Sequence, residues 1–222
     1  FEKYKYKKIK MLGKIYLFIL NLIRSSKITT FFIWGIKIKK YCHSTFWDLT
    51  TLVIKKELNF TNKKNYLDMG CGQFAILGQY YKKNNPTSTV MSVDIYEDFV
   101  NNSILNSKEN KNDIKIFQSN LFENIHDKFD LISFNPPYVP EVKDNNIQYS
   151  KIRYSGHNGT ELMSVFLNKA KKSLSNDGVI LLGINNFYVT KEDCLNVIKR
   201  YDYKVKKITK MPFNTSVVFV LQ

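Results

Sequence analysis

Short apolar runs alternate with amphipathic stretches between residues 65 and 201, and this alternation constrains the fold more than any other feature. Each run has five or six residues and is bounded by turn-forming residues, which is typical of buried strands. Strands that alternate with helices form a mostly parallel sheet covered on both faces. The expected strands are 65–69, 89–93, 114–118, 129–134 and 179–183, and the expected helices are 74–81, 97–107, 162–174 and 192–201.

The chain ends differently, in two expected strands at residues 203–208 and 216–221 with no helical stretch between them. Two such strands pair as a hairpin and add an antiparallel edge to the sheet. An Asn-Asp-Gly turn is expected at 176–178, just before the fifth strand. The sequence therefore predicts an α/β fold: a doubly wound, mostly parallel seven-stranded sheet with an antiparallel C-terminal edge hairpin.

The first 40 residues mix lysines with large apolar residues and predict one or two amphipathic helices, with a break at Ser25 and Ser26. We therefore divide the chain into a basic amphipathic helical extension, 1–40, and a main domain, 41–222. In the main domain, Ser44 or Thr45 is expected to cap a helix that runs towards Leu58.

The positive charge of the chain lies mostly near its beginning. Residues 1–60 contain 13 Lys and Arg against 3 Asp and Glu, a net charge of +10 out of +15 for the whole chain. This asymmetry indicates an anionic partner such as RNA, DNA or an acidic protein surface. A solvated basic face in a lysine-rich chain is the alternative.

Three cysteines, Cys42, Cys71 and Cys194, lie far apart and form no zinc-type cluster with histidine, so we expect no metal and a reducing, cytoplasmic location. The apolar runs 15–23 and 28–36 are shorter than the roughly 20 residues that span a bilayer. Packing of these helices on the main domain is the preferred interpretation, and an interfacial amphipathic helix stays open.

Polar side chains and glycines fall where successive strands end. Asp68, Gly70 and Gly72 follow the first strand as a glycine turn that opens a helix, a geometry that lets a ligand approach the backbone. The turn lacks the spacing of dinucleotide and polyphosphate sites, which favours a nucleoside. Asp94 ends the second strand, where a carboxylate can accept hydrogen bonds from ribose hydroxyls; capping of the next helix is the alternative.

The segment Asn135-Pro136-Pro137-Tyr138 follows the fourth strand and is the strongest chemical signal in the chain. The two prolines lock φ and leave their carbonyls free to accept, while Asn135 adds an amide and Tyr138 a flat aromatic face. This set suits a planar NH₂-bearing group, whereas on its own it could also be an ordinary strand-ending loop.

Together these residues resemble the class I S-adenosylmethionine-dependent methyltransferases over about residues 42–222. The resemblance implies that the cofactor S-adenosylmethionine is held at its methionine end by the glycine turn, at its ribose by Asp94 and at its adenine by Asn120 and Leu121. The chain departs from the family pattern at Phe74, where a third glycine is common, and at Asn120, where many members have Asp. The implied cofactor residues are Asp68, Gly70, Cys71, Gly72, Asp94, Ile95, Asn120, Leu121 and Asn135.

Within that class, Asn135 to Tyr138 together with residues 154–163 resemble the HemK-type protein N5-glutamine methyltransferases, and most closely their short, release-factor-modifying branch. Asp48 with Thr50 or Thr51 resembles an Asp-Thr pair of those enzymes. The resemblance implies Asn135, Pro136, Pro137 and Tyr138 as catalytic residues, a release factor or ribosomal protein as substrate and, as in some relatives, an activating subunit.

Three alternatives stay open: methylation of adenine N6 or guanine N2 in RNA or DNA, with the basic segment as a binding arm; methylation of a small molecule; and a non-catalytic nucleoside-binding scaffold.

Overall fold

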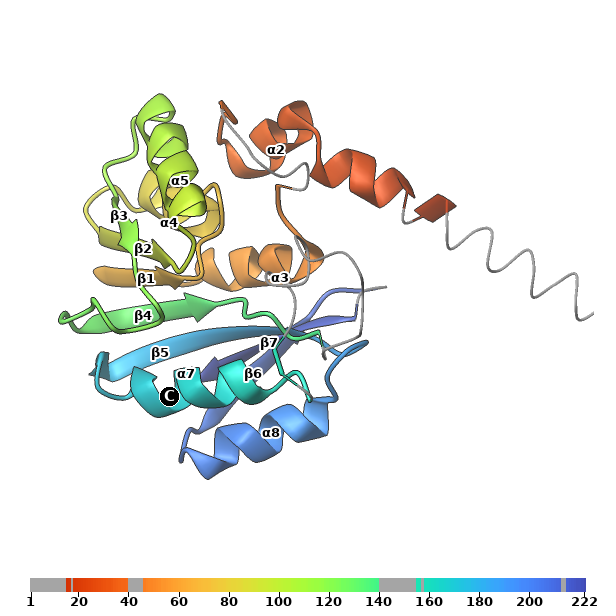
Figure 1. Ribbon diagram of the computed structural model, residues 1–222, viewed down its shortest axis with the longest axis vertical. Coiled ribbons are helices and arrows are strands. Elements are labelled where there is room, and N and C mark those ends of the chain that lie inside the picture. Colours follow the sequence, from red (N-terminus) through yellow and green to blue (C-terminus); the bar gives the residue numbers. More distant parts are fainter. Residues whose placement is uncertain (1–14, 17, 40–45, 140–154, 157, 213–214) are drawn as a thin grey trace, which may run out of the picture.

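The computed structural model describes residues 15–16, 18–39, 46–139, 155–156, 158–212 and 215–222. Its centre is a seven-stranded sheet with the order β3-β2-β1-β4-β5-β7-β6 (Figure 1). The first five strands in the chain pair in parallel, and β7 pairs antiparallel with both β5 and β6, as predicted. The strands are β1 (Asn65–Met69), β2 (Thr89–Asp94), β3 (Lys115–Gln118), β4 (Phe129–Phe134), β5 (Leu174–Asn185), β6 (Val205–Lys210) and β7 (Ser216–Leu221).

Helices cover both faces of the sheet because successive side chains of each strand point to opposite sides. Leu131 of β4 packs with α3 and α4, whereas its neighbours Ile132 and Phe134 pack with α7 and α8. The fold is therefore the predicted doubly wound α/β arrangement. The helices are α2 (Lys27–Trp34), α3 (Leu49–Leu58), α4 (Ile76–Asn84), α5 (Glu97–Glu109), α7 (Glu161–Ala170) and α8 (Lys191–Arg200).

The N-terminal helical segment is interrupted at Ser25 and Ser26, as the sequence predicted. Ser26 caps α2, and its hydroxyl accepts a hydrogen bond from the backbone N–H of Thr29 at 3.3 Å. Trp34 of α2 is buried in the core, and Thr30 accepts a hydrogen bond from the indole N–H of Trp47 at 3.1 Å. The predicted boundary between residues 40 and 41 lies outside the described residues. No helix in the described part of the chain is both long and apolar enough to cross a membrane.

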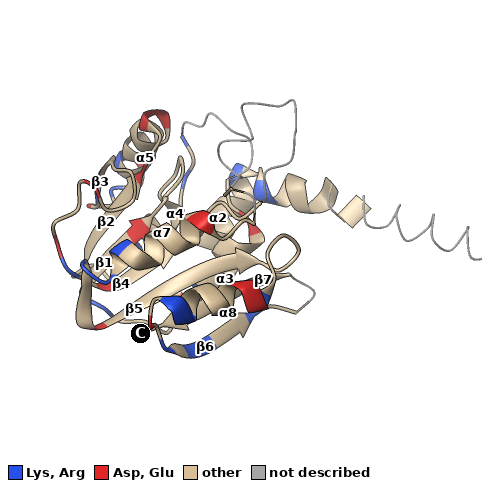
Figure 2. Cartoon of the chain, turned by 60° about the horizontal axis from the view of Figure 1, so that its bottom comes forward, with Lys and Arg blue, Asp and Glu red and all other residues tan. Residues whose placement is uncertain are grey.

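Acidic and basic residues are interspersed over the sheet and its covering helices (Figure 2). Residues 15–39, in contrast, contain four basic residues and no acidic one.

Three local predictions were wrong. The helix expected to start from a cap at Ser44 or Thr45, which lie outside the described residues, begins at Leu49 and is capped by Asp48, whose carboxylate accepts from the backbone N–H of Thr51 at 2.7 Å. The Asn-Asp-Gly sequence at 176–178 is not a turn before β5 but lies within that strand.

The sheet register explains the second error. Phe129 pairs with Leu174 and Leu131 with Val179, so two steps along β4 match five along β5. The extra residues bulge out of the ladder, and turn-forming residues tolerate such a bulge. Because Leu174 already pairs with β4, the helix expected to reach residue 174 ends at Ala170.

Candidate active site

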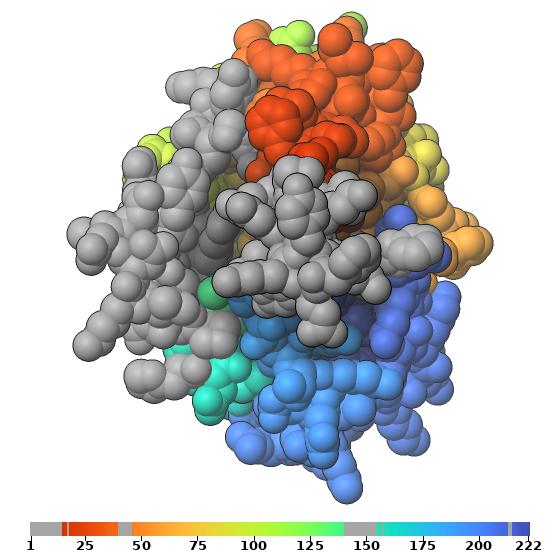
Figure 3. Space-filling view, turned by 90° about the vertical axis from the view of Figure 1, so that its right-hand side faces the viewer, coloured from red at the N-terminus to blue at the C-terminus, as the bar shows by residue number. Residues whose placement is uncertain are grey.

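A cavity of about 830 Å³ lies at the carboxyl edge of the parallel strands. Figure 3 looks onto this edge, with residues 15–39 (red to orange) above it and the chain around β5 and α8 (blue) below. The lining comes from the glycine turn after β1, the start of α3, the segment after β4, the loop after β5 and the helical residues before α2. Of the predicted site residues, Asp68, Gly70, Cys71, Gly72, Asn135, Pro136, Pro137 and Tyr138 line this cavity.

The glycine turn has the backbone conformation that its sequence predicts. Gly70 and Gly72 both have φ of +63°, in the left-handed region that a side chain disfavours. A Cβ on Gly72 would meet no atom within 4 Å, so the turn presents bare backbone to an open space. The turn is fixed from behind, because the N–H of Cys71 donates to the carbonyl of Val93 at 2.9 Å.

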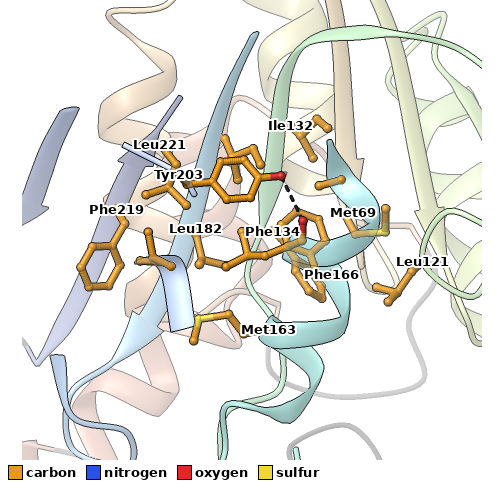
Figure 4. Packing of buried hydrophobic residues seen from close by; sticks show 14 of the residues in the cluster. Met69, Leu121, Ile132, Phe134, Met163, Phe166, Leu182, Tyr203, Phe219 and Leu221 are labelled. Carbon is orange, nitrogen blue, oxygen red and sulfur yellow. Dashed lines mark hydrogen bonds between the residues drawn. The ribbon is translucent and has the colours of Figure 1, made fainter. Parts of the chain in front are cut away.

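The core beneath the turn is aromatic. A Cβ on Gly70 would lie 3.1 Å from the ring of Phe134, the last residue of β4. That ring packs on Phe166 of α7, with ring centroids 4.6 Å apart (Figure 4). Close packing of this kind sets the level of the turn and of the segment that leaves β4.

Asp68 is buried under the turn and connects three elements. One carboxylate oxygen accepts from the N–H of Gly78 in α4 at 3.1 Å, and the other accepts from the hydroxyl of Ser133 in β4 at 3.3 Å. Burial disfavours the charged form and raises the pKa of Asp68 to about 7, although both hydrogen bonds act in the opposite direction.

Asp94 is placed at the end of β2, next to the turn. Its Oδ2 accepts from the N–H of Gly72 at 2.9 Å and its Oδ1 from the N–H of Tyr96 at 3.0 Å. Burial raises its pKa. Asp94 therefore binds the glycine turn directly, which sequence reasoning did not anticipate, while its proposed contact with a ribose stays a prediction.

The remaining predicted cofactor residues do not line the cavity. Ile95 is 49% exposed beside Asp94. Asn120 is exposed, and its amide donates to Glu123 at 2.8 Å. Leu121 is 8% exposed and packs into the core with a φ of +49°. The proposed contacts of Asn120 and Leu121 with adenine, and of Ile95 with the cofactor, stay predictions.

Asn135 is held by a carboxylate from α3. Its Nδ2 donates to Oδ1 of Asp48 at 3.2 Å and to Oδ2 at 3.1 Å. Because an ionised carboxylate only accepts hydrogen bonds, this contact fixes which end of the amide faces Asp48. The other end, Oδ1 of Asn135, is buried and has no hydrogen-bond partner among the described residues. A buried acceptor without a partner is costly in a folded protein and marks a place where a ligand N–H can bind.

Tyr138 belongs to the same network. Its hydroxyl donates to Oδ2 of Asp48 at 3.3 Å and contacts the hydroxyl of Thr50 at 3.2 Å. Burial and the neighbouring Asp48 carboxylate raise the pKa of Tyr138, so the phenol stays neutral and can donate. Its ring stacks on Tyr188, with centroids 6.1 Å apart.

The segment before α7 supports Tyr138 from behind. Gly159 has a φ of +73°, and a Cβ there would lie 2.5 Å from the carbonyl oxygen of Tyr138. The same segment also leads into the helix, since Ser155 accepts from the N–H of Leu162 at 3.0 Å. Pro140, Tyr154 and His157, which were part of the sequence pattern, lie outside the described residues.

Sequence reasoning missed two contributions to the site. It noted Asp48 only through a resemblance, although an Asp directly before a helix is an N-cap signal that could have located it. It also assigned no chemistry to the first 40 residues, yet Tyr16, Leu20, Asn21 and Arg24 line the cavity. Arg24 is the only basic residue among the described residues of the lining, and nothing in the local sequence distinguishes it.

A parallel sheet that gathers a glycine turn, a neighbouring carboxylate and an Asn-Pro-Pro-Tyr segment at one edge defines a class I S-adenosylmethionine-dependent methyltransferase. The comparisons with known proteins agree. The chain belongs to the methyltransferase small domain family, whose profile matches residues 40–209.

Three relatives show the range of the family. A Methanocaldococcus jannaschii protein named "Putative protein N5-glutamine methyltransferase" is 30% identical over 83% of this chain and 94% of its own length. The release factor glutamine methyltransferase of Flavobacterium psychrophilum is 27% identical over 73% of this chain, which spans only 60% of that enzyme. The ribosomal RNA small subunit methyltransferase C of Actinobacillus succinogenes is 35% identical, over 40% of this chain and 26% of its own length.

The fold is also shared with solved structures of low sequence identity to this chain. A solved methyltransferase from Pyrococcus furiosus superposes with a TM-score of 0.67 at 20% identity, over 91% of this chain and 95% of its own. The chain is thus an S-adenosylmethionine-dependent methyltransferase.

The cavity residues fit this cofactor. The open side of Gly72 admits a ligand against the backbone. The lining includes the acidic residues Asp48 and Asp68 and the basic residue Arg24, and such side chains would suit a sulfonium or ammonium group and a carboxylate. S-adenosylmethionine carries all three groups.

Proposed function

We propose that the chain transfers a methyl group to the side-chain nitrogen of a glutamine in a translation release factor or ribosomal protein. The observation that carries this proposal is the buried Oδ1 of Asn135, which has no hydrogen-bond partner in the described part of the chain and whose orientation is fixed by Asp48. An acceptor held in this way suits an incoming N–H group of a primary amide.

An amide nitrogen is a weak nucleophile because its lone pair is delocalised. Most of the rate acceleration therefore has to come from positioning this nitrogen against the methyl group. In the proposed complex, Oδ1 of Asn135 and the backbone carbonyl of Pro136 accept the two N–H bonds of the glutamine amide. Accepting both hydrogens stabilises the positive charge that develops on the nitrogen. Tyr138 packs against the plane of the amide. S-adenosylmethionine supplies an electrophilic methyl group when it is bound beside the glycine turn.

The relatives support a protein substrate. Those named as glutamine methyltransferases align over 73% and 83% of this chain. The relative named for ribosomal RNA aligns over 40%.

Methylation of adenine N6 or guanine N2 is the second candidate, because those amines are also planar and have two hydrogens. The net charge of +10 over residues 1–60 favours it. A nucleic-acid enzyme would bind its substrate with a steep salt dependence.

The deciding experiment uses tritiated S-adenosylmethionine, the purified chain and four acceptors: a release factor, a ribosomal protein, total RNA and DNA. We expect protease-sensitive, nuclease-resistant label that acid hydrolysis releases as methylamine, because acid cleaves the side-chain amide of N-methylated glutamine. A release factor whose acceptor glutamine is replaced by asparagine is the matched control. Label that nuclease removes would overturn the glutamine proposal in favour of the second candidate.

Two further points stay proposals of the same kind. Residues 1–40 are proposed to be an extension of the 41–222 methyltransferase domain, and the reaction is proposed to take place in the cytoplasm. An activating subunit could cover the sheet at β3 or β6, the two edge strands.

A further inference from the structure

The helical residues before α2 are amphipathic, but their apolar side faces outward. Ile15, Phe18, Ile19, Leu22 and Ile23 follow the i, i+3, i+4, i+7, i+8 spacing of one helix face and are 46%, 64%, 50%, 57% and 37% exposed. The other side of the same helix, with Leu20 and Arg24, lines the cavity. A helix that only packs on a domain would bury its apolar side against that domain and expose its polar side.

Helix α2 repeats this arrangement. Thr30 and Trp34 are buried against the main domain, whereas Ile28, Phe31 and Phe32 are 69%, 44% and 80% exposed. Figures 1 and 3 show the two helical stretches side by side at one end of the molecule. We call these eight exposed residues of 15–32 the outer apolar face. Monomeric proteins seldom expose so many large apolar side chains together unless something binds them.

The segment that carries the outer apolar face is basic, although Lys39 forms an ion pair with Glu109 of α5 at 3.0 Å. The described residues 15–39 contain Arg24, Lys27, Lys37 and Lys39 and no acidic residue, and residues 1–14 add six lysines and one glutamate in the sequence. Two copies of this chain pairing through the face would bring these charges together, which disfavours self-association.

The types of side chain on the outer apolar face restrict the possible classes of partner further. Five of the eight residues are aliphatic, and aliphatic side chains do not stack on nucleic-acid bases as aromatic rings do. Apolar residues on one helix face with lysine and arginine beside them are the signature of helices that lie in a lipid interface.

We propose that the outer apolar face binds the surface of a membrane rich in anionic lipid. The apolar side chains insert at the level of the lipid headgroups, and the lysines of this segment bind the anionic headgroups. The cavity-lining side of the same helix stays with the methyltransferase site, so this surface and the acceptor pocket are separate. The proposal is independent of which nitrogen the enzyme methylates.

The test is co-sedimentation of the whole chain with sucrose-loaded vesicles of phosphatidylcholine containing about one-third phosphatidylserine, with pure phosphatidylcholine as the neutral comparison. We expect binding to the anionic vesicles that weakens at about 0.5 M salt. The double variant Phe18→Ser/Leu22→Ser should need at least about tenfold more lipid for half-maximal binding.

A matched control is Phe60→Ser/Leu105→Ser, which removes two apolar residues that are 76% and 39% exposed elsewhere on the surface. It should bind vesicles like the wild type, and calorimetry with S-adenosylmethionine should show that both double variants are folded. Three results would each overturn the proposal. They are no binding of the wild type to anionic vesicles, unchanged binding of Phe18→Ser/Leu22→Ser, and a wild-type dimer in light scattering that this variant converts to a monomer.

Discussion

The amide nitrogen of Asn135 lies 3.1 Å and 3.2 Å from the two carboxylate oxygens of Asp48, although the two residues are 87 positions apart in the chain. Asp48 also caps α3 and accepts a hydrogen bond from the hydroxyl of Tyr138. One carboxylate thus joins the start of a helix to both polar side chains of the Asn-Pro-Pro-Tyr segment. Its position determines where the free oxygen of Asn135 lies.

Replacing Asp48 separates these roles. Asp48→Asn should keep the helix cap, because Asn caps about as well as Asp, but it no longer fixes the orientation of the Asn135 amide. We expect kcat to fall about ten- to a hundredfold, with the Kd for S-adenosylmethionine and the melting temperature nearly unchanged. Asp177→Asn, at an exposed position in the β5 bulge, is the control. An unchanged kcat would show that Asp48 is only a cap.

Removal of the proposed acceptor should affect chemistry and not binding. Asn135→Ala should lower methyl transfer by about a hundredfold or more, since it removes the group that stabilises charge on the acceptor nitrogen. Single-turnover transfer of labelled methyl measures the rate of chemistry, and calorimetric titration measures the affinity for S-adenosylmethionine. If turnover were retained, the proposed role of Asn135 would be wrong.

Asp94 should behave in the opposite way. Asp94→Ala is expected to weaken S-adenosylmethionine binding by about tenfold or more, because it removes the proposed ribose acceptor and leaves the N–H of Gly72 without its partner. Asp98→Ala, at an exposed position of α5, is a matched control. Equal calorimetric affinities for the two variants would contradict the ribose assignment.

The site residues that directly follow a single strand could be predicted from the sequence. The end of each strand is visible as an apolar run followed by Gly, Asp or Asn, and parallel strands bring such ends to one edge. The glycine turn and Asn135 were located in this way. The bulge at 176–178 was not, because local turn chemistry gave way to pairing of the flanking residues with β4.

Contacts between distant segments could not be predicted from the sequence. The pairing of Asp48 with Asn135 depends on how α3 crosses the sheet, and no local pattern encodes that crossing. The same holds for Arg24, which reaches the cavity because Phe46 donates its N–H to the Arg24 carbonyl and ties the two segments together at 3.0 Å. The amphipathic pattern of the first helix was clear, but which side would face solvent was not.

Gly183 of β5 should be intolerant of a side chain. A Cβ there would lie 2.6 Å from Cγ2 of Thr50 and 3.4 Å from Oδ1 of Asn135. Gly183→Ala should therefore lower the free energy of unfolding by about 1–3 kcal/mol and reduce methyl transfer. The double variant Gly183→Ala/Thr50→Ser removes the nearest methyl group but keeps the hydroxyl that contacts Tyr138, so it should recover part of both losses in urea unfolding and activity assays. Loss of the same size in both variants would place the strain elsewhere.

The buried carboxyl of Asp68 should make stability depend on pH. Its pKa is about 7 in the folded protein against 3.8 for a free side chain, so between these values the folded state keeps a proton that the unfolded chain releases. The free energy of unfolding should therefore fall as pH rises from about 4 to about 7, and this contribution should be constant above pH 7. Asp94, whose pKa is also raised, acts in the same direction. Asp68→Asn cannot ionise and should show a smaller fall in urea unfolding free energy between pH 5 and pH 8 than the wild type does. An identical pH profile for the two proteins would mean that Asp68 titrates normally in the folded state.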